Sequence, residues 1–362
     1  MKKHISLLFV VLLWSALALW AWCKPAQGTS LSERRTLAQF PELSTNSVLS
    51  GDFMSDFGDY AVDQFPLRDT FRQVKAVTTY YGFRQSDNNG IYIADGSAVK
   101  MEYPLNQSSV DNALARFNDL YEAYLQDASQ IVFAIVPDKG YYLGENTGHL
   151  TMDYASLFDT VEKGLSWAEF ADITDCLNAD SYYRTDTHWR QETLLPAVEK
   201  LSDALGIPAE KAFREETLEQ DFYGVYYGQA ALPLAPDVLR YLTWNGIEDC
   251  TVYSQDTGET TAVYDRNKLA SKDLYDIFLS GGMALQTIQN PNAATNRELI
   301  VFRDSFGSSL VPLLVPQYAA ITLIDTRYIS PAQIGDYVNF EDKDVLMLYS
   351  TLVLNSSSSL RK

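Results

Sequence analysis

Cysteine and histidine are scarce in this chain, and their scarcity narrows the chemistry that it can perform. The 362 residues include only 3 Cys and 3 His. No two cysteines have the short spacing of a zinc site. Cys23 ends the first apolar run, so Cys176 and Cys250 are the pair that could form a disulfide in an oxidising compartment. We therefore expect neither a metal ion nor a cofactor.

Basic residues are also few in comparison with acidic ones. The chain has 28 Lys and Arg against 47 Asp and Glu, which gives a formal net charge of -19. A surface of this sign repels a phosphate backbone, so we expect no nucleic-acid partner. The hydrophobic content of 46% is normal for a packed globular core.

One long apolar run is present, and it lies at the N-terminus. An uncharged stretch from Ile5 to Trp22 follows Lys2 and Lys3. At about 1.5 Å per residue its helix is close to the roughly 30 Å of a bilayer core. Basic residues before a span favour an inside N-terminus, so we expect the body of the chain on the extracytoplasmic side of the cell membrane.

We expect residues 1–23 to be retained as a single-pass signal anchor. Trp20, Trp22 and Cys23 make a poor small-residue cleavage site. The alternative is a signal peptide, whose cleavage would release a secreted protein. A lipoprotein signal ending at Cys23 is a third reading, but it needs a small residue where Trp22 stands.

The remainder of the chain divides into a linker and one large domain. Residues 24–50 are polar and contain proline, as in a juxtamembrane linker. From Phe53 to Tyr81 apolar residues recur at helical spacing, interrupted at Pro66, which predicts two short helices. We expect these helices to lead into a catalytic domain over residues 51–362.

Four continuous apolar runs predict strands that are buried on both faces. They are Gln130–Val136, Glu298–Phe302, Ala319–Ile324 and Val345–Tyr349. Helical patterns lie between them, notably over Val110–Leu125 and Thr193–Leu205. This alternation predicts an α/β fold with a mostly parallel sheet, whose functional residues gather at the carboxyl ends of the strands.

The choice of a catalytic base is narrow. His4 lies in the membrane segment, which leaves His149 and His188. Asp186 stands two positions before His188, and a carboxylate near an imidazole can fix its tautomer. This pair alone is a weak signal, because a single histidine is more often an ordinary buried residue. His149 lies among turn-forming residues and is expected at the surface.

Ser305 is the candidate nucleophile. It directly follows the strand pattern of Glu298–Phe302, and a strand-to-helix turn there would expose its hydroxyl at the sheet edge. Gly307 keeps the second glycine of a G-x-S-x-G elbow, but Arg303 stands at the first. The backbone amides of Ser305, Phe306 and Gly307 could supply oxyanion donors, with Arg303 as an accessory group. The alternative is that the serine only caps a helix.

Other residues could border the same site. Lys139 follows a predicted strand and could face the cleft, or it could form a surface pair with Asp138. Aromatic side chains suit stacking on sugar rings, although buried turn packing explains the tyrosines equally well. The candidates for substrate binding are Trp189, Tyr223, Tyr226 and Tyr227.

Several segments resemble the DHHW family, whose members are related to alginate O-acetyltransferases with an SGNH-hydrolase-like domain. They are YYRTDTHW, LIVFRDSFGSSLVPLL, AAITLIDTRYI and DVLMLYS, with FPLRDTFRQV, NNGIYIADG, VPDKGYY and DFYGVYYG upstream. The resemblance implies a three-layer α/β sandwich. It also implies that Asp186 is the orienting acid, His188 the base and Ser305 the nucleophile.

The sequence departs from the family pattern at two places. The motif that names the family reads Asp186, Thr187, His188, Trp189 here, so the acid and the base remain while the first histidine is absent. Arg303 stands before the Asp-Ser pair, where the family usually has Lys or Gly. A basic side chain is therefore kept in front of the turn.

The resemblance implies an extracytoplasmic O-acyltransferase that moves an acyl group, expected to be acetyl, through an acyl-serine to a cell-envelope or exported polysaccharide. It also implies a membrane-bound O-acyltransferase partner as the acyl donor. Three other readings stay open. A carbohydrate esterase would use the same triad with water as the acceptor. A glycan-binding scaffold protein would keep the fold without chemistry. A metal site on Asp186 and His188 would lack further histidine or cysteine ligands.

Overall fold

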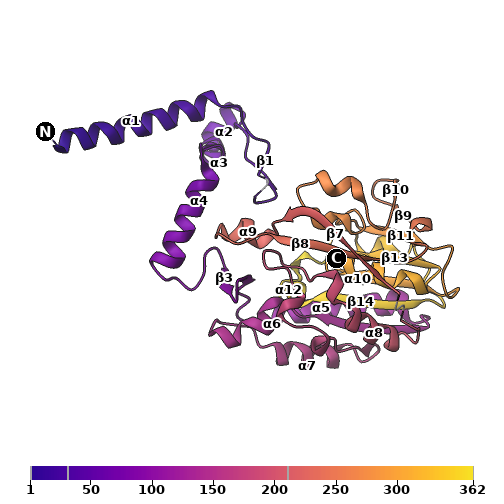
Figure 1. Cartoon of the computed structure of the whole chain (residues 1–362). Coiled ribbons are helices and arrows are strands. Elements are labelled where there is room, and N and C mark those ends of the chain that lie inside the picture. Colours follow the sequence, from indigo (N-terminus) through magenta and orange to yellow (C-terminus); the bar gives the residue numbers. More distant parts are fainter. Residues whose placement is uncertain (1, 31, 210–211, 362) are drawn as a thin grey trace. The chain divides into compact units, whose positions relative to one another are not determined.

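The computed structural model describes residues 2–30, 32–209 and 212–361. Within these described residues, contacts divide the chain into two compact units. The first comprises residues up to 89 and residues 227–233, and the second comprises residues 90–226 and those from 234 onward. Figure 1 shows both units, coloured along the sequence. The first unit contains both the predicted linker and the predicted helical lead-in.

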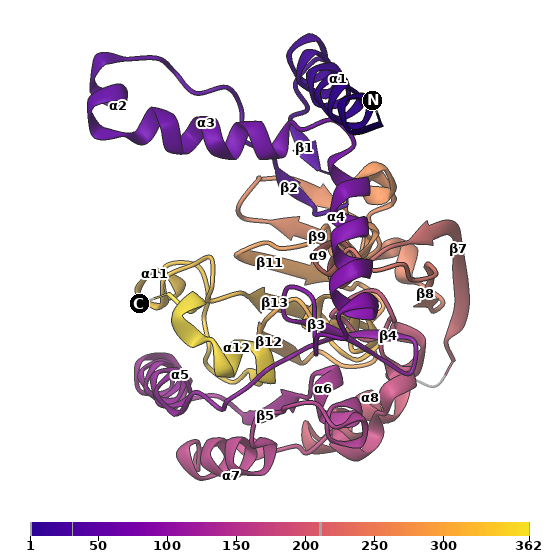
Figure 2. The same cartoon turned by 90° about the vertical axis from the view of Figure 1, so that its left-hand side faces the viewer.

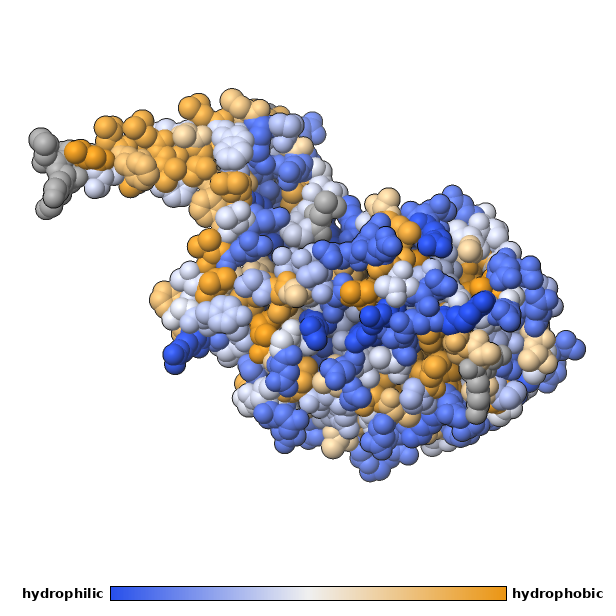
Figure 3. Space-filling model, in the orientation of Figure 1, coloured by the Kyte–Doolittle hydropathy of each residue, from blue (hydrophilic) through white to orange (hydrophobic). Residues whose placement is uncertain are grey.

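The first unit begins with the long apolar helix α1, Lys2–Cys23. Its segment Ile5–Cys23 has a mean hydropathy of 2.2, and none of it is buried against the rest of the protein. Apolar side chains cover this helix in Figure 3. A helix of this length and composition can cross a bilayer, as a signal anchor or a signal peptide does.

Short elements complete the first unit. They are β1 (Thr29–Ser30), β2 (Arg35–Thr36), α2 (Thr45–Ser50), α3 (Asp52–Asp63) and α4 (Arg68–Val77). The helices α3 and α4 flank Pro66, so the predicted pair of short helices is confirmed. Arg35 donates to both carboxylate oxygens of Asp63, at 2.7 and 2.5 Å. This pairing lowers the pKa of Asp63 to about 2.

The second unit is built on a mixed sheet. Among the described residues it has eight strands, in the order β10-β9-β11-β13-β12-β14-β5-β6. Their bounds are Thr260–Thr261, Thr251–Ser254, Leu285–Gln289, Ala320–Ile324, Glu298–Arg303, Asp344–Ser350, Gln130–Val136 and Glu169–Phe170. The strands from β13 to β6 pair in parallel, and the other three pair antiparallel. The predicted α/β fold with a mostly parallel sheet is confirmed.

Apolar side chains on the two faces of the sheet enter two separate cores. Along β5, Phe133 and Ile135 enter one core while Val132 and Ala134 enter the other. The first core is covered by α5 (Gln107–Leu120) and α7 (Tyr154–Gly164), and the second by α8 (Leu195–Ala204) and the hairpin of β7 (Arg214–Phe222) and β8 (Asp237–Thr243). Figure 2 shows α5 and α8 on opposite sides of the sheet. The predicted three-layer sandwich is therefore confirmed.

Several short elements complete the described chain. They are β3 (Ile91–Ala94), β4 (Ser97–Lys100), α6 (Lys139–Leu143), α9 (Val225–Ala230), α10 (Gly307–Leu310), α11 (Pro331–Ile334) and α12 (Thr351–Asn355). The first turn after β12 and the loop before α8 carry the residues singled out by the sequence.

Candidate active site

Ser305 occupies a tight turn between β12 and α10. The buried carboxylate of Asp304 fixes this turn, because it accepts hydrogen bonds from the amide of Phe306 at 3.0 Å and from the amide of Ser350 at 2.8 Å. An aspartate that binds the amide two residues ahead is a common turn device. The Ser305 side chain remains half-buried at the carboxyl end of the strand.

His188 reaches this turn from a distant loop. The loop folds back on itself, since Tyr182 pairs with Trp189 and the Tyr183 amide donates to the His188 carbonyl at 3.1 Å. His188 Nε2 lies 2.8 Å from Ser305 Oγ, and His188 Nδ1 lies 2.6 Å from Asp186 Oδ1. The three side chains predicted as a triad are thus in one continuous chain of hydrogen bonds.

Asp186 is completely buried, and its carboxylate is held from several directions. The amide of His188 donates to Oδ1 at 3.0 Å, and the amide of Val225 donates to Oδ2 at 2.7 Å. Gly224 packs so closely that an added Cβ would lie 2.2 Å from the Cβ of Asp186. This part of the DFYGVYYG segment therefore supports the acid, a role that its sequence alone did not suggest.

A tyrosine that the sequence did not point to lies over the imidazole. The ring of Tyr275 stacks on His188 with centroids 3.9 Å apart and an interplanar angle of 9°. Its hydroxyl lies 2.8 Å from Ser309 Oγ. Burial raises the pKa of Tyr275 well above its usual value, so the hydroxyl keeps its proton. Tyr275 restrains the tilt of the imidazole, and no local motif around it signals this.

Trp189 lies beneath the site. Its side chain is fully buried, and its Nε1 donates to the Phe306 carbonyl at 3.1 Å and to Ser309 Oγ at 2.9 Å. A side chain with no exposed surface offers no face to a sugar ring, which corrects the expectation that Trp189 binds substrate. It connects the loop that carries His188 to the turn that carries Ser305 instead.

Arg303 is also buried beneath the turn. Its guanidinium donates to Ser308 Oγ at 2.8 Å and lies 3.3 Å from the side-chain oxygen of Gln286. A Cβ added to Gly307 would come within 2.8 Å of the Arg303 Cβ, so the glycine lets the helix start against this side chain. These contacts support the turn from below and do not extend Arg303 to solvent.

The backbone amides of the turn divide into bonded and free groups. The amide of Phe306 donates to the Asp304 side chain, and that of Gly307 donates to the Asp304 carbonyl at 3.1 Å. Two of the three amides expected as oxyanion donors are therefore already engaged within the turn. The Ser305 amide donates no hydrogen bond to any residue in the described part of the chain. It is the turn's available donor for a developing oxyanion.

Lys139 lies close to the acid but inside the protein. It is only 2% exposed, and its Nζ donates to the Tyr183 carbonyl at 3.0 Å. The ammonium also lies 5.0 Å from the ring centroid of Tyr226. Burial lowers its pKa to about 7, against the opposing pull of Asp186 and other carboxylates. The alternative of a surface pair with Asp138 is wrong, because both side chains are buried.

The three tyrosines proposed for sugar stacking differ in exposure. Tyr223 is 40% exposed and presents a face to solvent. Tyr226 is buried, with its hydroxyl 3.0 Å from Thr187 Oγ1, so its role is to pack under the loop. Tyr227 is half-buried and belongs to the first compact unit.

The other scarce residues lie outside this arrangement. His149 is half-exposed and stacks on Tyr92 with ring centroids 3.7 Å apart. Cys176 and Cys250 are both free thiols. In the described residues, no group of three or more His, Cys, Asp or Glu side chains is arranged to hold a metal ion.

Solved structures similar to this chain include a DHHW family protein from Eubacterium siraeum, with a TM-score of 0.60, 20% identity, and coverage of 76% of this chain and 97% of that chain. Bacillus cereus PatB1, solved with a sulfonyl adduct, gives a TM-score of 0.57 and 18% identity, and the match covers 75% of this chain and 97% of that chain. The O-acetyltransferase domain of Pseudomonas putida AlgJ gives a TM-score of 0.45 and 15% identity, and the match covers 74% of this chain and 92% of that chain.

No curated protein matches the chain. The family model described as DHHW protein matches residues 167–324. This range contains the acid, the base and the serine of the hydrogen-bonded chain. The chain is therefore similar to the DHHW family over residues 167–324, the segment that brings Asp186, His188 and Ser305 together.

Proposed function

We propose that this protein is an extracytoplasmic O-acyltransferase that forms an acyl-enzyme on Ser305. One observation carries the proposal: the hydrogen-bonded chain from Asp186 to His188 at 2.6 Å and from His188 to Ser305 at 2.8 Å. A serine hydroxyl, an imidazole and a buried carboxylate in this order are the parts of a serine-type acyl-transfer site.

The geometry assigns a role to each group in the first half-reaction. His188 Nε2 takes the Ser305 proton while Oγ attacks the acyl carbonyl, and Asp186 stabilises the imidazolium that forms. The Ser305 amide donates to the oxyanion. The bond to the donor's leaving oxygen then breaks, and His188 returns the proton to that oxygen. The product is an ester between the acyl group and Ser305.

The second half-reaction repeats these steps with an acceptor hydroxyl. His188 removes its proton, the acceptor oxygen attacks the acyl-serine, and Ser305 regains its proton from the imidazolium. The family resemblance favours acetyl as the acyl group, a polysaccharide hydroxyl as the acceptor and a membrane-bound donor partner. The apolar helix α1 is compatible with this setting. Exposed Tyr223 offers one aromatic face for a sugar ring.

Covalent labelling tests the nucleophile directly. PatB1, a protein of similar fold, was solved with a sulfonyl adduct. We expect a sulfonyl fluoride and an activated acetyl ester each to add one group to Ser305, detected by intact mass and peptide mapping. Ser305→Ala should add none, and His188→Ala should react about 10⁴-fold more slowly. Ser86→Ala, at an exposed serine, is the matched control and should label normally. Equal labelling of Ser305→Ala and wild type would refute the proposal.

The fate of the acetyl-enzyme separates the related functions. Incubation with oligosaccharides should transfer the acetyl group to a sugar hydroxyl faster than water removes it. Loss of the acetyl group to water at the same rate with and without sugar would identify an esterase. Sugar binding measured by calorimetry, without any acyl-enzyme, would identify a glycan-binding scaffold.

A further inference from the structure

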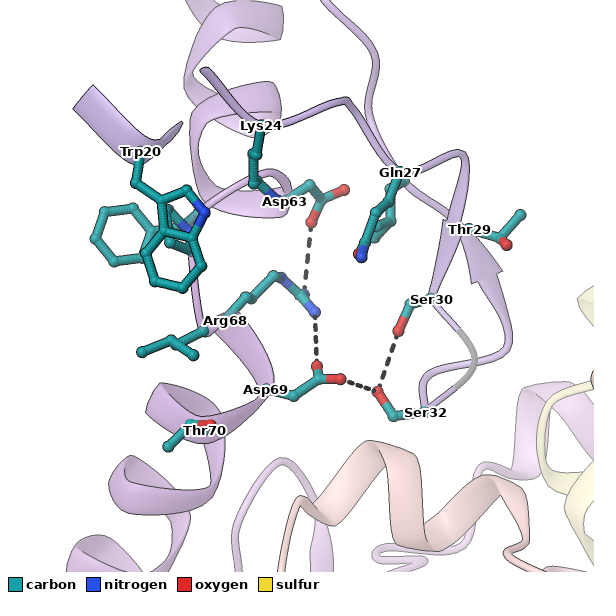
Figure 4. Close-up of a pocket in the computed structure, with 14 residues that line it drawn as sticks. Trp20, Lys24, Gln27, Thr29, Ser30, Ser32, Asp63, Arg68, Asp69 and Thr70 are labelled. Carbon is teal, nitrogen blue, oxygen red and sulfur yellow. Dashed lines mark hydrogen bonds and ion pairs between the residues drawn. The ribbon is translucent and has the colours of Figure 1, made fainter. Parts of the chain in front are cut away.

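A pocket of about 400 Å³ lies at the C-terminal end of α1, within the first compact unit. Figure 4 shows the side chains around it. They come from the end of α1, from the segment that follows, and from the adjoining ends of α3 and α4. The residues used below are Trp20, Lys24, Asp63, Phe65, Leu67 and Arg68.

One wall of the pocket is apolar and continues along the membrane helix. Trp20 and Leu67 are 48% and 52% exposed, and Phe65 is a third apolar residue that lines the pocket. The ring of Phe65 also lies 6.3 Å from the ring of Trp14, farther along α1. Leu67 adopts a left-handed backbone, with φ of 58°, which is unfavourable for a branched side chain. An exposed apolar wall of this kind suits lipid chains.

The opposite wall is polar and holds unsatisfied cationic donors. Arg68 pairs with Glu33 and lies 3.5 Å from Asp63, yet its buried Nε donates to no group in the described chain. Lys24 also lines the pocket (Figure 4), and it forms no ion pair or side-chain hydrogen bond with any described residue. Two N–H donors of positive charge therefore border one cavity.

The same wall provides acceptors. Asp69 is 57% exposed; it accepts from the hydroxyl of Ser32 at 3.1 Å and lies 3.6 and 3.7 Å from the guanidinium groups of Arg68 and Arg72. Asp63 is buried, and its pairing with Arg35 keeps it ionised. Carboxylates and cations both line the cavity. A ligand with only negative charge would therefore leave the carboxylate acceptors without a donor. A phosphate that carries a hydroxyl or ammonium group satisfies both kinds of group.

We propose that this pocket binds the headgroup of a membrane phospholipid, with its acyl chains along Phe65 and α1. Lys24 and Arg68 donate to the phosphate, and Asp69 accepts from the hydroxyl or ammonium of the headgroup. The continuity of the apolar wall with α1 favours a lipid over a free anion. The site requires that α1 is retained as an anchor, and it does not depend on acyl transfer.

Lipid retention tests the proposal without measuring activity. The full-length chain is reconstituted in vesicles of phosphatidylethanolamine and phosphatidylglycerol, extracted in mild detergent, and analysed by native mass spectrometry. We expect one phospholipid per wild-type chain. Lys24→Gln should lower this retention about tenfold, because a charge-assisted hydrogen bond is lost. Lys24→Arg, which keeps the charge, should retain the lipid.

The matched control is Lys75→Gln, which removes the same charge from an exposed position on α4 outside the pocket lining and should leave retention unchanged. Equal retention by Lys24→Gln and wild type would overturn the proposal. Displacement of the lipid by millimolar inorganic phosphate alone would overturn it as well, and would assign the pocket to free anions.

Discussion

At Gly224 the backbone of one segment touches the acid of another. An alanine methyl group would lie 2.2 to 2.5 Å from the Cβ, Cα and N atoms of Asp186. We expect Gly224→Ala to displace the acid and reduce acyl-enzyme formation about 10²-fold, since small misplacements have effects of this size. Gly58→Ala, where the added methyl meets open space, is the matched control. A wild-type rate for Gly224→Ala would contradict the close packing.

Tyr275 allows its ring and its hydroxyl to be tested separately. Tyr275→Phe keeps the ring that stacks on His188 and loses only the contact with Ser309, so its rate of acyl-enzyme formation should stay near wild type. Tyr275→Leu removes the ring that orients and stabilises the imidazolium. It should slow the reaction about tenfold, in line with roughly 1 to 2 kcal/mol for a cation over a ring. Equal rates for the two variants would argue against a role for stacking.

Lys139 makes the stability of the protein depend on pH. Its pKa is about 7 in the folded chain and 10.5 in the unfolded chain, because burial disfavours the charged form. Between these values the unfolded state binds more protons, so this lysine makes stability rise with pH, at up to about 1.4 kcal/mol per pH unit. Lys139→Met should lose this rise over pH 7 to 9.5 in urea unfolding. Exposed Lys163→Met should keep it, and parallel curves for Lys139→Met and wild type would be evidence against the assignment.

At the scale of elements, Trp189 connects the loop of the base to α10. Trp189→Phe loses both indole hydrogen bonds, so the free energy of unfolding should fall by about 1 to 3 kcal/mol and acyl-enzyme formation should slow. Trp167→Phe is the control, because it loses a comparable bond to Asn118 at 2.8 Å and packs against the other core, away from the core that contains Trp189. It should lower stability while leaving the reaction rate unchanged. Equal reaction rates for both variants would show that the connection does not position the base.

The central strands were predictable because burial on both faces leaves a continuous apolar run. The predicted strand Gln130–Val136 coincides with β5, and the other three agree with β12, β13 and β14 within a residue at each end. The strand β7 was not predicted, because it is almost entirely exposed and only Leu218 and Phe222 in it are buried. Its sequence, REETLEQDF, has no strand signature without its partner β8.

At the scale of the whole molecule, the sequence identified the three side chains of the hydrogen-bonded chain but not their supports. Asp186 and His188 share a short motif, and Ser305 ends a recognisable strand. Gly224 and Tyr275 contact the site only through tertiary packing, and nothing in their local sequence records which residue they will touch. The same holds for the amides of Phe306 and Gly307, whose hydrogen bonds depend on the conformation of Asp304.

Whether the mature protein retains α1 or loses it by cleavage can be tested on the intact chain. We expect the mature protein in the membrane fraction to keep its N-terminal segment, because Trp22 and Cys23 make a poor cleavage site. Intact-mass measurement of protein extracted from membranes should give the full-length chain. A shorter species beginning after residue 23, found in the medium, would identify a cleaved signal peptide.

The acid and the imidazole are carried by one short loop, whereas the hydroxyl belongs to a separate strand end. Any shift of the loop would move the first two groups as a single piece and keep their mutual bond intact. A form of the protein with the loop displaced would therefore look normal to a probe of the carboxylate–imidazole contact. It would be recognised only by a widened gap between the imidazole and the serine oxygen.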